Sequence, residues 1–85
     1  MKNSERLAEL TDEDVVVFDN YDYDSALIGL SEDGRAVYDY DLMVKYLMDK
    51  EGWSVEDAVE WIDYNTIRAL PYVAKSPIIV YRLQD

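Results

Sequence analysis

The chain has 85 residues, 49% of them hydrophobic, with no cysteine or histidine and a formal net charge of −11 at pH 7. The missing cysteine excludes disulfides, thiolate metal sites and cysteine nucleophiles, and the missing histidine excludes the commonest general base. The length suits one domain over residues 1–85, and the hydrophobic content predicts a folded chain despite the charge.

The N-terminal quarter begins with an uncertain element and continues with a predicted strand. Residues 1–11 are compatible with a short helix or a flexible arm, because Leu7 and Leu10 have helical spacing over a very short stretch. The β-branched run Val15–Phe18 predicts a strand that is buried on nearly both faces. Residues 19–25 follow as a polar loop rich in acids.

The next segment predicts a β-hairpin. Two apolar stretches, 26–30 and 35–38, are separated by a turn that contains the dipeptide Asp33–Gly34. Asp-Gly favours a two-residue type I′ turn, since both central residues need positive φ. In that register Glu32 lies opposite Arg35 as a favourable cross-strand pair.

Two helices and a last strand complete the chain. The first helix begins at Asp39 or Asp41 as N-cap and ends near Glu51, because Gly52 suits the left-handed position after a helix. Its apolar stripe consists of Tyr40, Met43, Val44 and Leu47.

The second helix has Ser54 as its N-cap and ends before Pro71, around residues 68–70. Its apolar stripe is expected to be Val55, Ala58, Val59 and Ile62. Pro77 then opens a strand over residues 78–83. The order β-β-β-α-α-β predicts an α+β fold in which a small antiparallel sheet carries two helices on one face.

Motifs for catalysis or cofactor binding are absent from the sequence. An EF-hand frame that starts at Asp22 fails, because Leu27 occupies the sixth position, where the loop needs glycine. No serine lies in a nucleophile elbow, and three isolated glycines cannot form a phosphate-binding loop. We therefore expect no enzyme and no cofactor. A weak divalent-ion site in residues 19–24, or a small enzyme, stays an alternative.

The charge is uneven, and this points to a protein partner. Segments 11–33 and 53–67 contain acids and no base. Such segments repel nucleic acid and anionic membranes and attract basic protein surfaces, including those of nucleic-acid-binding proteins. Tyrosine beside carboxylate in an exposed loop is favourable interface chemistry. The candidate partner-binding residues are Asp19, Tyr21, Asp22, Tyr23, Asp24, Glu56, Asp57, Glu60 and Asp63.

Residues 34–41 and 60–72 together resemble a family of small acidic proteins from gut Firmicutes and their phages and mobile elements. The resemblance covers roughly residues 15–83 and brings no activity, cofactor or site residue with it. Small acidic proteins of phages are often inhibitors of host defence, such as anti-CRISPR proteins and DNA mimics.

The leading hypothesis is therefore a non-enzymatic binding protein, with an inhibitor as one form of it. The alternative is a structural or regulatory domain whose charge serves only solubility. Without a signal peptide or an apolar run that could span a membrane, we expect a cytoplasmic protein. The sequence leaves open whether it is a monomer or a homodimer.

Overall fold

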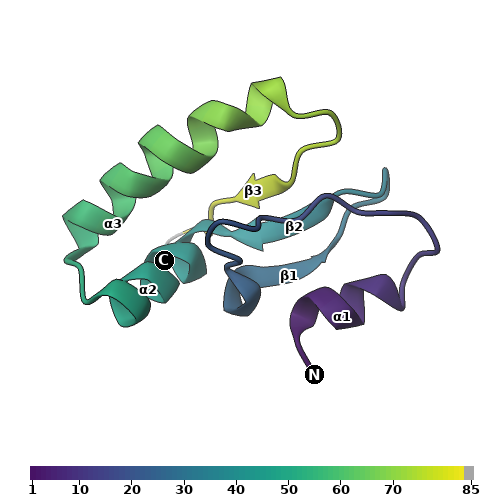
Figure 1. Cartoon of the computed structure of the whole chain (residues 1–85), viewed down its shortest axis with the longest axis horizontal. Helices are drawn as coiled ribbons and strands as arrows, with labels where there is room; N and C mark the ends of the chain where they lie inside the picture. Colours follow the sequence, from purple (N-terminus) through teal and green to yellow (C-terminus); the bar gives the residue numbers. More distant parts are fainter. Residues whose placement is uncertain (84–85) are drawn as a thin grey trace.

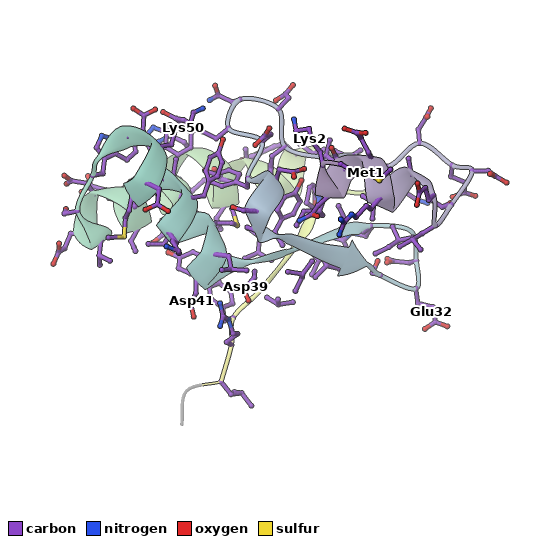
Figure 2. The ribbon with its side chains drawn as sticks, turned by 90° about the horizontal axis from the view of Figure 1, so that it is seen from below. Met1, Lys2, Glu32, Asp39, Asp41 and Lys50 are labelled. Carbon is purple, nitrogen blue, oxygen red and sulfur yellow. The ribbon has the colours of Figure 1, made fainter. Side chains whose placement is uncertain are left out.

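The computed structural model describes residues 1–83 and consists of a small sheet with helices on one side (Figures 1 and 2). The α-helices and strands are α1 (Asn3–Ala8), β1 (Leu27–Leu30), β2 (Ala36–Asp39), α2 (Tyr40–Glu51), α3 (Val55–Trp61) and β3 (Ile78–Val80). The shorter helical turns are η1 (Asp24–Ala26), η2 (Ile62–Thr66) and η3 (Ile67–Tyr72). This arrangement confirms the predicted α+β class. None of the helices within residues 1–83 is long and apolar enough to cross a membrane.

The sheet is mixed, which corrects the antiparallel sheet expected from the sequence. The strand order is β1-β2-β3, with β1 antiparallel and β3 parallel to β2. The chain from Val55 to Tyr72 stays helical through α3, η2 and η3, and it runs back along the sheet (Figure 1). Because this crossover returns the chain to the end where β2 starts, β3 pairs in the parallel sense.

The predicted strand Val15–Phe18 does not form. The segment is extended, but it belongs to no ladder, and the Phe18 amide donates to the Tyr38 hydroxyl at 3.3 Å. Val16 and Val17 are 40% and 37% exposed, so the expected burial on nearly both faces is also wrong. High β-propensity means that a side chain fits well on the pleated surface of a sheet. It does not ensure that a neighbouring strand is available for pairing.

The predicted hairpin forms with a different turn. The Gly34 amide donates to the Ser31 carbonyl at 3.0 Å, and the Ser31 amide donates to the Arg35 carbonyl at 2.8 Å. Glu32 and Asp33 are therefore the central turn residues, and Gly34 follows with φ of 83°. This three-residue loop ends in a left-handed glycine, so Ser31, and not Glu32, pairs with Arg35.

The predicted helix caps are confirmed. The Asp39 side chain accepts a hydrogen bond from the Leu42 amide at the start of α2, and Gly52 follows the helix with φ of 71°. The Ser54 side chain accepts from the Asp57 amide at the start of α3. The helical path does not end before Pro71, because η3 includes that residue. Val55 is also 49% exposed, so the buried stripe of α3 is shorter than expected.

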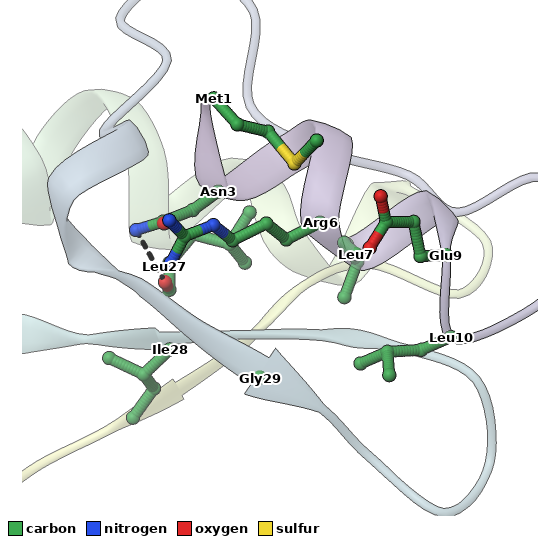
Figure 3. A pocket seen from close by; sticks show the side chains of 9 residues that line it. All are labelled: Met1, Asn3, Arg6, Leu7, Glu9, Leu10, Leu27, Ile28 and Gly29. Carbon is green, nitrogen blue, oxygen red and sulfur yellow. Dashed lines mark hydrogen bonds between the residues drawn. The ribbon is translucent and has the colours of Figure 1, made fainter.

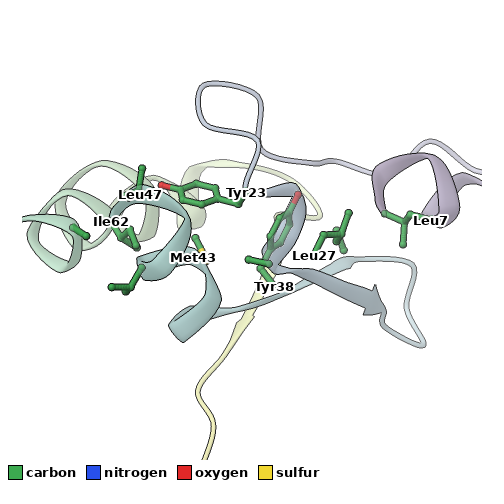
Figure 4. Close-up of a cluster of buried hydrophobic side chains, with 11 residues drawn as sticks. Leu7, Tyr23, Leu27, Tyr38, Met43, Leu47 and Ile62 are labelled. Carbon is green, nitrogen blue, oxygen red and sulfur yellow. The ribbon is translucent and has the colours of Figure 1, made fainter. Parts of the chain in front are cut away.

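The core lies on one side of the sheet (Figure 4). Its largest fully buried side chains are Tyr23, Tyr38, Met43, Leu47 and Ile62. They come from the segment before η1, from β2, from α2 and from the start of η2, so the sheet and both long helices share one hydrophobic cluster.

Candidate functional site

A groove lies between the extended segment that precedes η1 and the helical run that follows α3. Its volume is about 300 Å³. Apolar side chains such as Val16, Val17 and Leu70 form much of its lining, and Asp19 adds a carboxylate. The groove exists because the valine segment lies extended without joining the sheet, which leaves it beside the helices.

A second depression of about 330 Å³ lies on α3 and η2. We call it the α3 hollow. It is lined by Trp53, Asp57, Glu60, Trp61, Tyr64 and Asn65. Counting from Asp57, four of these residues follow the i, i+3, i+4, i+7 spacing that places side chains on one helix face. The rings of Trp53 and Trp61 are 6.4 Å apart between centroids, at 39° to each other.

Trp61 and Asn65 line both depressions, so the groove and the hollow adjoin. We call the combined area the acidic aromatic surface. It brings Asp19 from the first base-free segment together with Asp57 and Glu60 from the second. Within residues 1–83, none of the residues that line either depression is lysine or arginine. The surface therefore combines apolar area, aromatic rings and uncompensated negative charge.

Tyr21 anchors the extended segment against the helices. Its hydroxyl donates to Glu51 Oε1 at 2.7 Å, and its ring meets Trp61 edge-on with centroids 4.9 Å apart. The hydrogen bond to Glu51, together with partial burial, raises the pKa of Tyr21 above its ordinary value. Tyr21 also lines the groove, so it contributes to the surface while it holds one wall in place.

Tyr23 is not the exposed anchor that the sequence predicted. It is 1% exposed and packs edge-on against Phe18, with ring centroids 5.6 Å apart. Its hydroxyl lies 3.4 Å from Thr66 Oγ1, and burial raises the pKa of Tyr23 to about 12. Two tyrosines two residues apart thus have different environments, because the chain turns at Tyr23 with φ of 48°.

The predicted binding residues Asp22 and Asp24 are engaged within the chain. Asp24 accepts from the backbone amides of Asn3 at 2.9 Å and Ser4 at 3.0 Å, so it satisfies free donors in the first turn of α1. Asp22 pairs with Lys2 Nζ at 3.0 Å. Partial burial alone would raise the pKa of Asp22, but hydrogen bonds from Lys2 and the Asp24 amide lower it below its ordinary value.

The two remaining predicted acids of α3 and η2 lie outside the depressions. Asp63 accepts a hydrogen bond from the Tyr40 hydroxyl at 3.0 Å, and Glu56 is exposed. Neither lines the groove or the α3 hollow. Five of the nine predicted residues therefore line the two depressions, namely Asp19, Tyr21, Tyr23, Asp57 and Glu60, although Tyr23 is almost fully buried.

The sequence predicted only the two acids of the hollow as binding residues. It did not predict the other four residues that line it, namely Trp53, Trp61, Tyr64 and Asn65, although Tyr64 is 62% exposed. The signal was available in part, because Asp57, Glu60, Trp61 and Tyr64 repeat at helical spacing away from the buried Ala58. Their proximity to Asp19 was not visible, since it depends on tertiary packing.

A third depression, of about 580 Å³, lies between α1 and β1 (Figure 3). Met1, Leu10 and Ile28 expose apolar area around it, and it includes Arg6 as well as Glu9. Asn3 Nδ2 donates to the Leu27 carbonyl at 3.2 Å, so one backbone group of the edge strand β1 is already satisfied. Its charged side chains are one base and one acid, which gives it no excess of side-chain charge of either sign.

Neither the arrangement of acidic side chains nor the comparisons with known proteins add a further candidate site. Within residues 1–83, no group of three or more acidic side chains is arranged to hold a metal ion. Comparisons with protein-family models, curated proteins and solved structures find no match.

Proposed function

We propose that this protein is a non-enzymatic binding domain that docks its acidic aromatic surface on a basic region of a partner protein. One observation carries the proposal: Asp19 lines the groove, and Asp57 and Glu60 line the adjoining α3 hollow. Both depressions contain aromatic and apolar side chains and, within residues 1–83, no lysine or arginine. Protein interfaces are enriched in tryptophan and tyrosine, and complementary charge accelerates and orients association.

The test compares the protein with a variant in which the surface loses its charge. The variant is Asp19→Asn/Asp57→Asn/Glu60→Gln. The wild-type chain is immobilised, partners are captured from the native host at low salt, and binding of each identified partner is measured with purified protein. We expect the variant to bind the partner at least about tenfold more weakly, because several interfacial charge pairs are lost together.

A matched control separates the surface from net charge. Asp12, Asp14 and Glu32 are exposed acids that line neither depression. The variant Asp12→Asn/Asp14→Asn/Glu32→Gln removes the same number of charges and should retain most of the affinity. Equal losses of affinity in both variants would show that only the total negative charge matters. That result would favour the alternative of a domain whose charge serves solubility.

Competition with DNA identifies the class of partner. Basic protein surfaces are often nucleic-acid sites, and the resemblance to proteins of phages and mobile elements makes nucleases of host defence the first partners to test. If duplex DNA displaces the protein from its partner, the protein covers a nucleic-acid site, as an inhibitor of the DNA-mimic type would. If DNA and the protein bind together, it docks on another basic region.

A further inference from the structure

We infer that the α3 hollow accepts an arginine side chain of the partner, while the adjoining groove accepts a neighbouring apolar side chain. This inference rests on the proposed function and specifies the partner segment that the surface recognises. That segment carries an arginine next to an apolar residue such as leucine.

The composition of the hollow favours a guanidinium group. Three aromatic residues, Trp53, Trp61 and Tyr64, surround a space that also has the carboxylates of Asp57 and Glu60. Aromatic faces attract cations, and arginine combines this stacking with forked hydrogen bonds to carboxylates. Lysine is a compact and strongly hydrated charge that uses ring faces less well.

The helix positions the two carboxylates for a shared ligand. Asp57 and Glu60 are three residues apart on α3, a spacing at which the Cβ atoms are about 5–6 Å apart. Both residues are exposed, and neither forms a side-chain ion pair within residues 1–83. Their charge is therefore available to an incoming cation.

The molecule already contains one guanidinium–aromatic contact at the edge of this region. The Arg68 guanidinium carbon lies 5.4 Å from the ring centroid of Tyr64. Arg68 does not line the hollow, and within residues 1–83 it forms no ion pair with Asp57 or Glu60. The contact illustrates the chemistry that we infer for the partner.

The groove adds the second half of the recognition. Apolar area next to Trp61 comes from Val16, Val17 and Leu70. Trp61 also lines the hollow. Burial of an aliphatic side chain stabilises a complex roughly in proportion to the apolar area removed from water. A peptide that reaches both depressions is stabilised by guanidinium recognition in the hollow and by apolar burial in the groove. A purely basic peptide is stabilised only by the contacts in the hollow.

The experiment uses the intrinsic fluorescence of the protein, because both of its tryptophans line the hollow. The full chain is titrated with three blocked tetrapeptides that differ at one position and contain leucine with arginine, lysine or citrulline. Citrulline has nearly the shape of arginine without its charge. We expect a saturable change in tryptophan emission with the arginine peptide up to about 10 mM, weaker binding with lysine and none with citrulline.

Two variants assign the effect to the hollow. Asp57→Asn/Glu60→Gln should weaken binding of the arginine peptide by about three- to thirtyfold, since two exposed charge pairs are lost. Glu56→Gln is the matched control, because Glu56 is an exposed acid on the same helix outside the hollow. It should change the affinity by less than about twofold. Circular dichroism of each variant verifies that the fold is retained.

The outcomes separate this inference from the proposed function. No saturable change with the arginine peptide, equal responses to arginine and citrulline, or equal effects of both variants would overturn the arginine site. If that happens while partner capture still depends on Asp19, Asp57 and Glu60, the proposed function stands and only the arginine site is rejected. If the peptides bind as expected but partner capture ignores the surface, the proposed function fails instead.

Discussion

Tyrosine has several different roles in this molecule, and its position in the fold decides which role applies. Tyr23 and Tyr38 are 1% and 0% exposed and form part of the core. Tyr21 joins the extended segment to α2 through its hydroxyl. Tyr64 and Tyr72 are 62% and 89% exposed. A phenol accommodates all these environments because it combines a large apolar ring with one hydrogen-bonding group.

Two tyrosines with raised pKa values predict a loss of stability in alkaline solution. Burial raises the pKa values of Tyr23 and Tyr40 to about 12, compared with the ordinary value of 10.0, and a hydrogen bond to Asp63 adds to the rise for Tyr40. The phenolate therefore forms more readily in the unfolded chain. These groups leave the free energy of unfolding unchanged below about pH 10 and lower it as the pH rises from about 10 to 12.

Urea unfolding between pH 8 and pH 12 measures this effect. Tyr23→Phe should flatten the alkaline decrease, because the variant has no hydroxyl to ionise at that site. Tyr72→Phe is the control, since its side chain is almost fully exposed. An alkaline decrease that is identical in wild type and Tyr23→Phe would contradict the prediction.

At the scale of elements, the hairpin shows how glycine determines local geometry. Gly34 has φ of 83°, a left-handed conformation in which other residues are strained. A Cβ at this position would have only one neighbour within 4 Å, Glu13 Oε2 at 3.8 Å. Replacement of Gly34 therefore causes backbone strain without a steric clash.

Gly34→Ala should lower the free energy of unfolding by about 1–2 kcal/mol, the usual cost of a left-handed conformation for an L-residue. Gly29→Ala is a matched control in the same hairpin, because Gly29 has no positive φ and an added methyl group would meet no atom within 4 Å. The control should change stability by less than about 0.5 kcal/mol. Urea denaturation compares the two variants, and equal effects would argue against conformational strain at Gly34.

At the scale of the whole molecule, the net charge of −11 opposes compactness while the core favours it. Within residues 1–83, five ion pairs offset part of the repulsion, among them Lys2 with Asp22 at 3.0 Å and Arg82 with Asp39 at 2.7 Å. Acids at the tip of the hairpin, such as Glu32, lie far along the molecule from α2 (Figure 2). The charge is thus spread over the molecule, and only part of it belongs to the acidic aromatic surface.

Sodium chloride should stabilise the folded protein and weaken partner binding. Added salt shortens the screening length from about 10 Å at 0.1 M to about 3 Å at 1 M, which reduces repulsion among the carboxylates. The urea midpoint should therefore rise with salt, and it should rise less in Asp12→Asn/Glu13→Gln/Asp14→Asn, which has less repulsion to screen. A midpoint that falls with salt would mean that attractive ion pairs dominate.

Local signals in the sequence were sufficient for several elements and for part of the candidate site. Ser54 was predicted as a cap, Asp39 as one of two candidate caps, and Gly52 as a helix end, because each depends on backbone groups only a few residues away. The helical spacing of Asp57 and Glu60 likewise placed both acids on the solvent-exposed face of α3. Such features follow from covalent geometry and from hydrogen bonds within one turn.

By itself, then, the sequence determined the α+β class, the capped helices, the existence of the hairpin and the excess of negative charge. Only the tertiary structure decided that Val15–Phe18 stays outside the sheet, that β3 is parallel to β2, that Tyr23 is buried and that Asp19 lies near Trp61. The physical reason is that each of these outcomes depends on contacts between residues far apart in the chain, where packing overrides local preference. The acidic aromatic surface belongs to this second group, because segments 16–23 and 53–77 form it only after the chain has folded.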